Sequence, residues 1–524
     1  MNFSETLPKE HPMVTENSAS PTETLPRYQS GNESDVSGTG ALADLLPEKC
    51  STATAGILNT FMWTGNSFAI TNVILASLGP LKYHLSFHDA FLCGFAGLTM
   101  GSFSVAFIST FALKHGRRAL NRHVVGRVPA RILASLNCAT TLGILVVELI
   151  AAGQILSAIV ALAVFPTSIA IVTSACITGI VLILGVKKIY PDYALCAQIV
   201  AVFILSSVVT SQPVHLTTSV PLSLMGAKDE LSLGHRISFF NLCLSRAILY
   251  SPFATSIGKY DGKSNKSGLI FLQTLIGMLL SFAFTFVVGA GLGAKADTIA
   301  TWREAYEGSI GTLIAEVLHP TGMMLKISCG IVLVLGIMIN MIKSMYSMLA
   351  DLYDLSSRLE SVPTPIYPTV IMPICVMFAV LGRDHLADIM ISVYSITGSL
   401  ASIWFGVLLT EYVLFDKCMG YNNKWLLQED ERQFPLGLAS SVTFLLSCTV
   451  VVLCMTQTWY IGPIGFFFKS SGLDVSYCLL TTYPLLTLPT LARDLGRIRS
   501  LCHPLSDSPL CRVEVHRTIP FQCR

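Results

Sequence analysis

The chain has 524 residues, of which 52% are hydrophobic and only 13% are charged. A typical soluble domain carries roughly a quarter charged residues, so this composition and a mean hydropathy of +0.62 exclude a soluble enzyme. The 34 basic and 32 acidic residues nearly cancel, to a formal net charge of +2. The molecule therefore lacks the positive field that drives nucleic-acid binding, and we expect no nucleic-acid partner.

The two ends of the chain are polar. Residues 1–48 are rich in Ser, Thr, Glu and Pro and have little to bury, which is typical of a disordered tail. Residues 493–524 form a second predicted tail. We recognise neither a cleavable signal peptide nor a lipidation motif, so we expect the hydrophobic helices to anchor the protein.

Apolar segments of about 20 residues, the length that crosses a bilayer, recur between these tails. We predict twelve transmembrane helices, near residues 54–80, 89–113, 131–155, 160–186, 194–211, 235–257, 268–294, 321–350, 364–382, 386–415, 435–456 and 472–491. Basic residues gather in the connections after the second, fourth and sixth segments and in the C-terminal tail, whereas the opposite loops, such as 295–320, carry few. Because basic loops stay cytoplasmic, we predict a multi-pass membrane protein with both termini in the cytoplasm.

Two of these segments contain helix-breaking or polar residues at membrane depth, where unwound backbone persists only beside protein or a water-filled cavity. The first segment has Trp63, Gly65 and Asn66 near its middle, and Pro252 removes a backbone donor from the sixth. One interrupted helix in each half is typical of inverted-repeat transporters, which bind substrate at the interruptions. We therefore predict breaks at Gly65 and Pro252, with Asn66 and Trp63 available to a ligand. The alternative for Asn66 is a polar contact between helices.

Ionisable groups inside apolar segments cost on the order of 2.5–3.5 kcal/mol each and are candidates for function. Glu148 lies far from either end of the third segment, and a carboxyl group in such surroundings can exchange a proton near working pH, which predicts proton coupling. Arg246, in the sixth segment, offers the alternative of a structural ion pair with Glu148. In the eighth segment, Asn340, Lys343 and Ser344 are spaced to share one helix face, which we expect to point inward. Two cations near one carboxylate suit an anionic or electron-rich substrate.

Other short patterns predict no enzyme. Gly289, Gly291 and Gly293 lie inside the seventh segment without a following strand–helix unit, so we interpret them as close helix packing. We find no zinc-protease, Walker or Gly-x-Ser-x-Gly motif. We therefore expect no cofactor and no catalytic or metal site, and transport driven by an ion gradient, with the proton gradient as the energy source.

Several short motifs follow one another between about residue 50 and residue 499. They are Gly79-Pro80, Phe87-His88-Asp89, Lys114 to Arg118 with Arg122 and Gly126-Arg127, Ala152-Gly153-Gln154, Asn340 with Met345-Tyr346-Ser347, Val362 to Pro365, Gly398, Glu411, Pro435 to Ala439, Met455 to Pro463, and Gly472-Leu473-Asp474. Their order and spacing resemble the fungal purine-cytosine permeases, a branch of the nucleobase:cation symporter-1 family.

The resemblance implies an all-α membrane protein with a leucine-transporter-like fold. Two inverted five-helix repeats would occupy residues 49–382 and continue through 383–415, and two additional helices would lie within 416–492. It also implies proton-driven uptake of cytosine and purines across the plasma membrane. Binding in the family uses the first, third, sixth, eighth and tenth helices. Asn340 lies where the family keeps a substrate-binding asparagine, and Gln154 belongs to a matching motif.

The chain departs from the family at the expected site. Glu148 replaces an asparagine, Tyr250 replaces a stacking tryptophan, and Lys343 and Ser344 replace a proline and a second asparagine. We expect Tyr250 to stack on the substrate. The small-molecule cargo is then a nucleobase or related nitrogen heterocycle, with a pyridoxine-like or acidic heterocycle as the alternative. A non-transporting nutrient sensor on the same scaffold is a further alternative.

Overall fold

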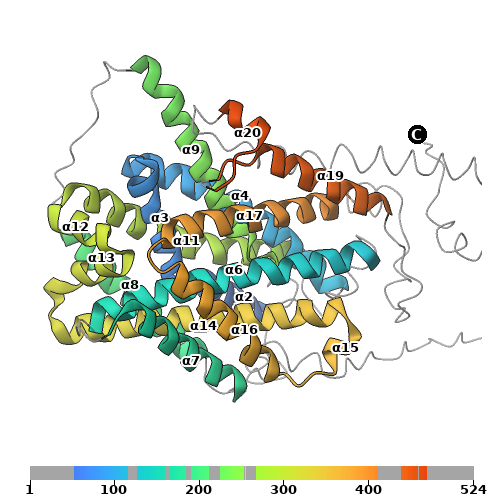
Figure 1. Cartoon of the computed structure of the whole chain (residues 1–524), viewed down its shortest axis with the longest axis horizontal. Helices are drawn as coiled ribbons and strands as arrows, with labels where there is room; N and C mark the ends of the chain where they lie inside the picture. Colours follow the sequence, from blue (N-terminus) through green and yellow to red (C-terminus); the bar gives the residue numbers. More distant parts are fainter. Residues whose placement is uncertain are drawn as a thin grey trace, which may run out of the picture.

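The structure is a computed structural model that describes residues 52–115, 127–160, 165–184, 191–211, 225–252, 254, 267–410, 438–457 and 459–468. Within these residues the chain is helical apart from short connections and one isolated β-bridge between Thr456 and Ile461. Figure 1 shows the helices gathered in one bundle. The predicted tails 1–48 and 493–524 and the predicted segment 472–491 lie outside the described residues.

Each predicted transmembrane segment from 54–80 to 435–456 overlaps at least one described helix. The helices are α2 (Thr52–Ser67), α3 (Ile70–Tyr83), α4 (Phe87–His115), α6 (Arg127–Val160), α7 (Thr167–Ile183), α8 (Pro191–Ser211), α9 (Met225–Ile248), α11 (Ser267–Thr298), α12 (Ala300–Gly308), α13 (Ile310–Val317), η4 (His319–Thr321), α14 (Met323–Leu355), α15 (Ser357–Glu360), α16 (Ile366–Leu381), α17 (Leu386–Thr410), α19 (Leu438–Cys454) and α20 (Pro463–Phe468).

Five of the described helices are long and apolar enough to cross a membrane. They lie within α4, α6, α11, α14 and α17. Their outward faces are apolar too: Leu272, Ile276 and Leu280 of α11 are exposed, while Phe282 and Phe286 of the same helix are buried. A helix that is apolar on both faces suits a lipid surface outside and a protein core inside. The chain is thus a multi-pass membrane protein, and the count of twelve spans stays a prediction.

Close helix packing explains the glycine-rich sequence in α11. A side chain at Gly289 would collide with the Val73 carbonyl of α3, and one at Gly293 would collide with the Ser77 carbonyl. Small residues at such positions allow two backbones to approach closely. The interpretation of these two glycines as packing residues is confirmed, whereas Gly291 lies on a more open face.

The connection 295–320, predicted to link the seventh and eighth transmembrane segments, contains two short helices. Ser309 ends α12 and caps α13, because its hydroxyl oxygen accepts a hydrogen bond from the Thr312 backbone N–H at 3.0 Å. The α13 helix has a wholly apolar buried face that includes Leu313 and Ile314, and Gly311 brings it against the Gln154 backbone of α6. Both helices lie at one end of the bundle, opposite α15 (Figure 1). Hydropathy did not predict these two helices, because short helices at the end of a bundle need no membrane-length apolar run.

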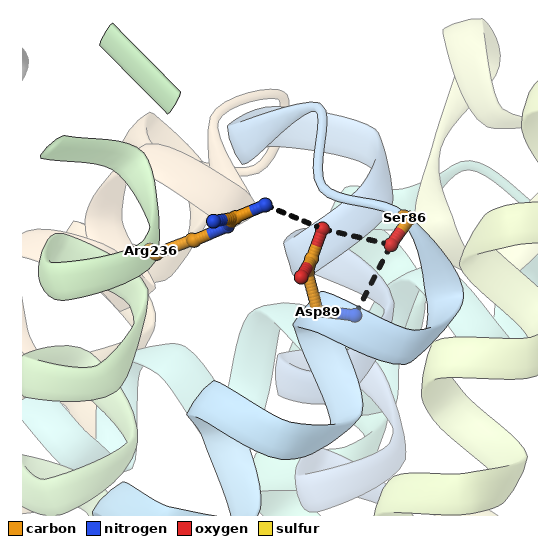
Figure 2. Close-up of polar contacts among 3 residues, drawn as sticks. All are labelled: Ser86, Asp89 and Arg236. Atoms are coloured by element: carbon orange, nitrogen blue, oxygen red, sulfur yellow. Dashed lines mark hydrogen bonds and ion pairs between the residues drawn. The ribbon is translucent and has the colours of Figure 1, made fainter. Parts of the chain in front are cut away.

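The start of α4 is capped and tied to α9. The Asp89 backbone N–H donates to the Ser86 hydroxyl at 3.1 Å, and that hydroxyl donates to the Asp89 carboxylate at 2.9 Å. Arg236 of α9 forms an ion pair with the same carboxylate at 3.1 Å, as Figure 2 shows. Ser86 therefore caps the start of α4 through its side chain. The ion pair between Arg236 and Asp89 holds the α3–α4 corner beside α9, which carries the second interrupted region.

Candidate functional site

The first predicted segment is interrupted between α2 and α3. Phe68 and Ala69 are not helical, and Ala69 has extended backbone angles. The Asn72 side-chain amide spans this interruption by donating to the Ser67 carbonyl at 2.6 Å. A buried helix end needs such a partner for its free carbonyls. Gly65, the predicted break position, lies in the last turn of α2, and the interruption begins three residues later.

A second interruption follows the end of α9. The Tyr250 backbone N–H bonds to the Ala247 carbonyl at 3.1 Å, a spacing of three residues that tightens the last turn. The Ala254 N–H then bonds to the Tyr250 carbonyl at 3.1 Å. Pro252 lies just after this tightened turn, at a position where its missing N–H removes one helical hydrogen bond. Tyr250 is therefore held at the interruption itself.

Arg246 connects the two interruptions. Its Nε donates to the Asn72 Oδ1 at 2.8 Å, and its Nη2 donates to the Tyr250 hydroxyl at 3.1 Å and to the Thr71 hydroxyl at 3.4 Å. The side chain is 5% exposed. A guanidinium group at this depth is costly unless its donors are satisfied. These neutral partners account for two of its three nitrogens.

Two tyrosine rings flank the same guanidinium. Its carbon lies 5.0 Å from the Tyr250 ring centre and 5.2 Å from the Tyr394 ring centre, distances at which a cation is attracted to an aromatic face. Tyr394 belongs to α17, which approaches α9 closely because Gly398 packs directly against Ser245. The absence of a side chain at Gly398 thus brings Tyr394 within reach of Arg246.

Glu148 of α6 lies close enough to Arg246 to interact with it electrostatically. It is 3% exposed, and its Oε2 is fully enclosed without a hydrogen-bond partner in the described part of the chain. Arg246 and Lys343 are the cations whose charge acts on it. No ion pair joins Glu148 to Arg246 among the described residues, where the guanidinium bonds to Asn72, Thr71 and Tyr250 instead. The predicted alternative of a direct structural ion pair is not what the structure forms.

We call these residues the polar cluster. It consists of Thr71, Asn72, Glu148, Arg246, Tyr250, Lys343 and Tyr394, from or beside helices α3, α6, α9, α14 and α17. It combines cationic donors, a carboxyl group with an unused oxygen, and two aromatic rings. Chemically, such a cluster can exchange a proton, bind a negative or electron-rich group and stack on a flat ring.

Of the predicted site residues, Glu148, Arg246, Tyr250 and Lys343 come together in the polar cluster. Asn340 and Lys343 are half-buried and Ser344 is buried, all within α14. Asn66 is half-buried in the last turn of α2. Within the described ranges, no hydrogen bond joins Asn66, Asn340 or Ser344 to the cluster.

Two other predicted site residues face elsewhere. Trp63 is 1% exposed. It packs against Gly277 of α11, and a Cβ added to that glycine would lie only 2.7 Å from the Trp63 Cβ. Gln154 donates from Nε2 to the Arg383 carbonyl at 2.7 Å, at the end of the bundle covered by α13. Both contacts are typical of helix packing.

The cluster also contains residues that sequence reasoning missed: Thr71, Asn72 and Tyr394. Asn72 lies in a run from Phe68 to Leu75 that is apolar apart from Thr71, and an amide in such a run is a signal that could have identified it. Thr71 and Tyr394 carry no comparable signal, since hydroxyls are common in membrane helices and usually bond to their own backbone.

Known proteins resemble this chain over most of its length. The family model described as permease for cytosine/purines, uracil, thiamine, allantoin matches residues 47–424. The purine-cytosine permease FCY21 of Saccharomyces cerevisiae is 23% identical over 440 residues, which cover 79% of each chain. The vitamin B6 transporter TPN1 of Saccharomyces cerevisiae is 22% identical over 468 residues, which cover 80% of each chain.

A solved structure has the same fold. Mhp1, a nucleobase-cation-symport-1 family transporter in a closed conformation with bromovinylhydantoin bound, superposes with a TM-score of 0.57 at 12% identity, covering 88% of this chain and 96% of Mhp1. These similarities are to transporters and permeases rather than to enzymes. The family match covers well over half of the chain, so this protein belongs to the family of permeases for cytosine/purines, uracil, thiamine and allantoin.

Proposed function

We propose that the protein is a secondary active transporter that couples proton entry to the uptake of a small nitrogen heterocycle across the plasma membrane. Its termini lie in the cytoplasm, and its helices form two inverted five-helix repeats with two additional helices. Rocking of a bundle that contains α2, α3 and α9 against the remaining helices would open the site to each side in turn.

One observation carries this proposal: the polar cluster lies where both interrupted helices meet. Glu148 has an enclosed carboxyl oxygen without a partner, and Arg246 reaches across from one interruption to Asn72 at the other. Charged groups inside membrane helices are energetically unfavourable, and those that persist there are typical of a transport pathway. A pure packing role would leave the unused oxygen of Glu148 unexplained.

The proposed roles follow from the chemistry of each side chain. Glu148 takes up and releases the proton. Tyr250 stacks on the heterocycle, a contact worth about 0.5–1.5 kcal/mol beyond burial. Asn340 and Asn66 form hydrogen bonds with the polar edge of the ring. Lys343 and Arg246 provide positive charge around it.

Uptake of labelled cytosine, adenine, pyridoxine, orotate and nicotinate into a transporter-deficient host tests the proposal. We expect accumulation of at least one compound to rise as external pH falls and to collapse with an uncoupler. In Glu148→Gln the pH-driven accumulation should be lost. Glu304→Gln, which alters an exposed carboxylate of α12, is the matched control and should behave as the unmodified protein.

The possible failures are distinct. Unchanged accumulation in Glu148→Gln would remove Glu148 from proton coupling. Binding without counterflow in reconstituted vesicles would favour the nutrient sensor instead.

A further inference from the structure

The polar cluster has more positive than negative charge. Arg246 and Lys343 are its cations and Glu148 is its carboxyl group. The other titratable groups that interact electrostatically with Glu148 are the tyrosines Tyr250 and Tyr394, which are neutral at working pH. When Glu148 holds a proton, no carboxylate in the cluster balances the guanidinium of Arg246.

The guanidinium of Arg246 has unused donors. Its Nε and Nη2 bond to neutral oxygens of Asn72, Thr71 and Tyr250. Nη1, which carries two N–H groups, has no hydrogen-bond partner within the described ranges, and it is not among the fully enclosed polar atoms that lack one. The guanidinium is thus held along the edge formed by Nε and Nη2, while Nη1 is not fully enclosed.

The neutral bonds hold the group in place but do not compensate its charge. A guanidinium group bonds most strongly to an anionic oxygen, and burying a cation without a counter-charge is unfavourable. The two aromatic rings at 5.0 and 5.2 Å recover part of this cost. The cluster is therefore arranged to receive an anion, and its own carboxyl group is not bonded to the guanidinium.

Building on the proposed function, we infer that the cargo is a heterocyclic acid bound as its monoanion, with its negative group on Arg246 Nη1 and within the field of Lys343. Glu148 carries the accompanying proton. One anion and one proton then move together in each cycle, and the net charge transferred across the membrane is zero. A neutral heterocycle moving with a proton would instead transfer one positive charge.

Matched pairs of probes test the inference in vesicles reconstituted with the full chain. Orotate is uracil with an added carboxylate, and nicotinate is the acid of the uncharged amide nicotinamide. We expect at least one acid to be taken up with an apparent affinity at least about tenfold higher than its uncharged partner, the factor that one charge-assisted hydrogen bond provides. Its uptake should respond to an inward proton gradient and should not change when a potassium diffusion potential is imposed.

Variants separate anion binding from a structural role of Arg246. Arg246→Gln should abolish the preference for the acid. Arg246→Lys, which keeps the charge but loses the geometry of the bond to Asn72, should retain the preference while lowering thermal stability. Lys343→Gln should reduce the preference without affecting the bond between Arg246 and Asn72. Arg236→Gln is the matched control, because Arg236 lies on the same helix and pairs with Asp89 outside the cluster.

Three results would overturn the inference. If uracil, cytosine or pyridoxine is taken up as well as or better than the acids, and its uptake increases with an inside-negative potential, the cargo is neutral and the proposed function stands alone. If folded protein accumulates none of the probes, the inference fails together with the proposed function. If Arg246→Gln and Arg246→Lys both reduce uptake of an acid and of its uncharged partner equally, Arg246 has only a structural role.

Discussion

Asn72 allows the sharpest test of how the two interruptions are joined. Its amide donates to the Ser67 carbonyl at 2.6 Å, and its Oδ1 accepts from Arg246 Nε at 2.8 Å. All three side chains are buried. Replacing Asn72 with the similarly sized Leu removes both bonds and leaves a carbonyl and a guanidinium N–H without partners.

Asn72→Leu should lower the free energy of unfolding by a large amount for a single substitution. Each buried group left unsatisfied costs about 1–3 kcal/mol, with the charged group at the upper end, so Asn72→Leu should destabilise the protein by about 2–6 kcal/mol. Asn59→Leu is the matched control, since Asn59 of α2 makes one half-buried hydrogen bond to Gln273 at 3.0 Å. That bond is neutral and should contribute about 0.5–1.5 kcal/mol.

Thermal unfolding of both variants in detergent, followed by fluorescence of the purified protein, provides the comparison. We expect Asn72→Leu to unfold at a clearly lower temperature than Asn59→Leu and to bind cargo more weakly, because Arg246 loses its support. Equal unfolding temperatures for the two variants would refute the conclusion that Asn72 holds the interruptions together.

Three further predictions follow from other contacts. Asn72→Asp places a carboxylate beside Arg246 Nε and should abolish orotate uptake by supplying an internal counter-charge, as an uptake assay against the unmodified protein will show. Gly311→Ala forces a Cβ into the α6 backbone and should lower stability by about 1–3 kcal/mol in thermal unfolding, whereas Gly291→Ala, with its nearest neighbour at 3.7 Å, should change it little. The exposed ion pair between Lys82 of α3 and Asp388 of α17, at 2.9 Å, should contribute no more than about 1 kcal/mol to stability. Lys82→Glu should slow transport, because it places two like charges at this contact between α3 and α17. Adding Asp388→Lys should restore the transport rate. A double variant that transports as slowly as Lys82→Glu would contradict this prediction.

Hydropathy predicted the positions of the five long apolar helices well, because a bilayer imposes both length and composition. The segment predicted at 89–113 is α4 at Phe87–His115, and the segment predicted from residue 386 is α17, which begins at Leu386. Hydropathy carries no such information for α12 and α13. Their short amphipathic pattern resembles that of an ordinary polar loop with scattered apolar residues.

The interruptions were predicted in the correct segments but a few residues away from where they occur. We placed them at Gly65 and Pro252, the residues that most weaken a helix, whereas the structure interrupts the chain at Phe68 and at Leu249. The reason is tertiary: Asn72 supplies a partner for the free carbonyl of Ser67. Helix propensity alone cannot show where such a partner lies.

The ionised members of the polar cluster could be predicted because charged residues in apolar segments are rare. Glu148, Arg246 and Lys343 each had that signal. Tyr394 did not, since its contact with Arg246 depends on the close approach of α17 at Gly398. The sequence alone indicates which groups are unfavourable to bury. It does not indicate which faces of the five helices that form the polar cluster contact one another.

A structure determined with orotate at saturating concentration tests directly whether the polar cluster binds the anion. We predict density for the ligand among α3, α6, α9, α14 and α17, with its carboxylate within hydrogen-bond distance of Arg246 Nη1 and its ring against Tyr250. Ligand density elsewhere in the bundle, with Arg246 and Glu148 unchanged and out of contact with it, would contradict the proposed site.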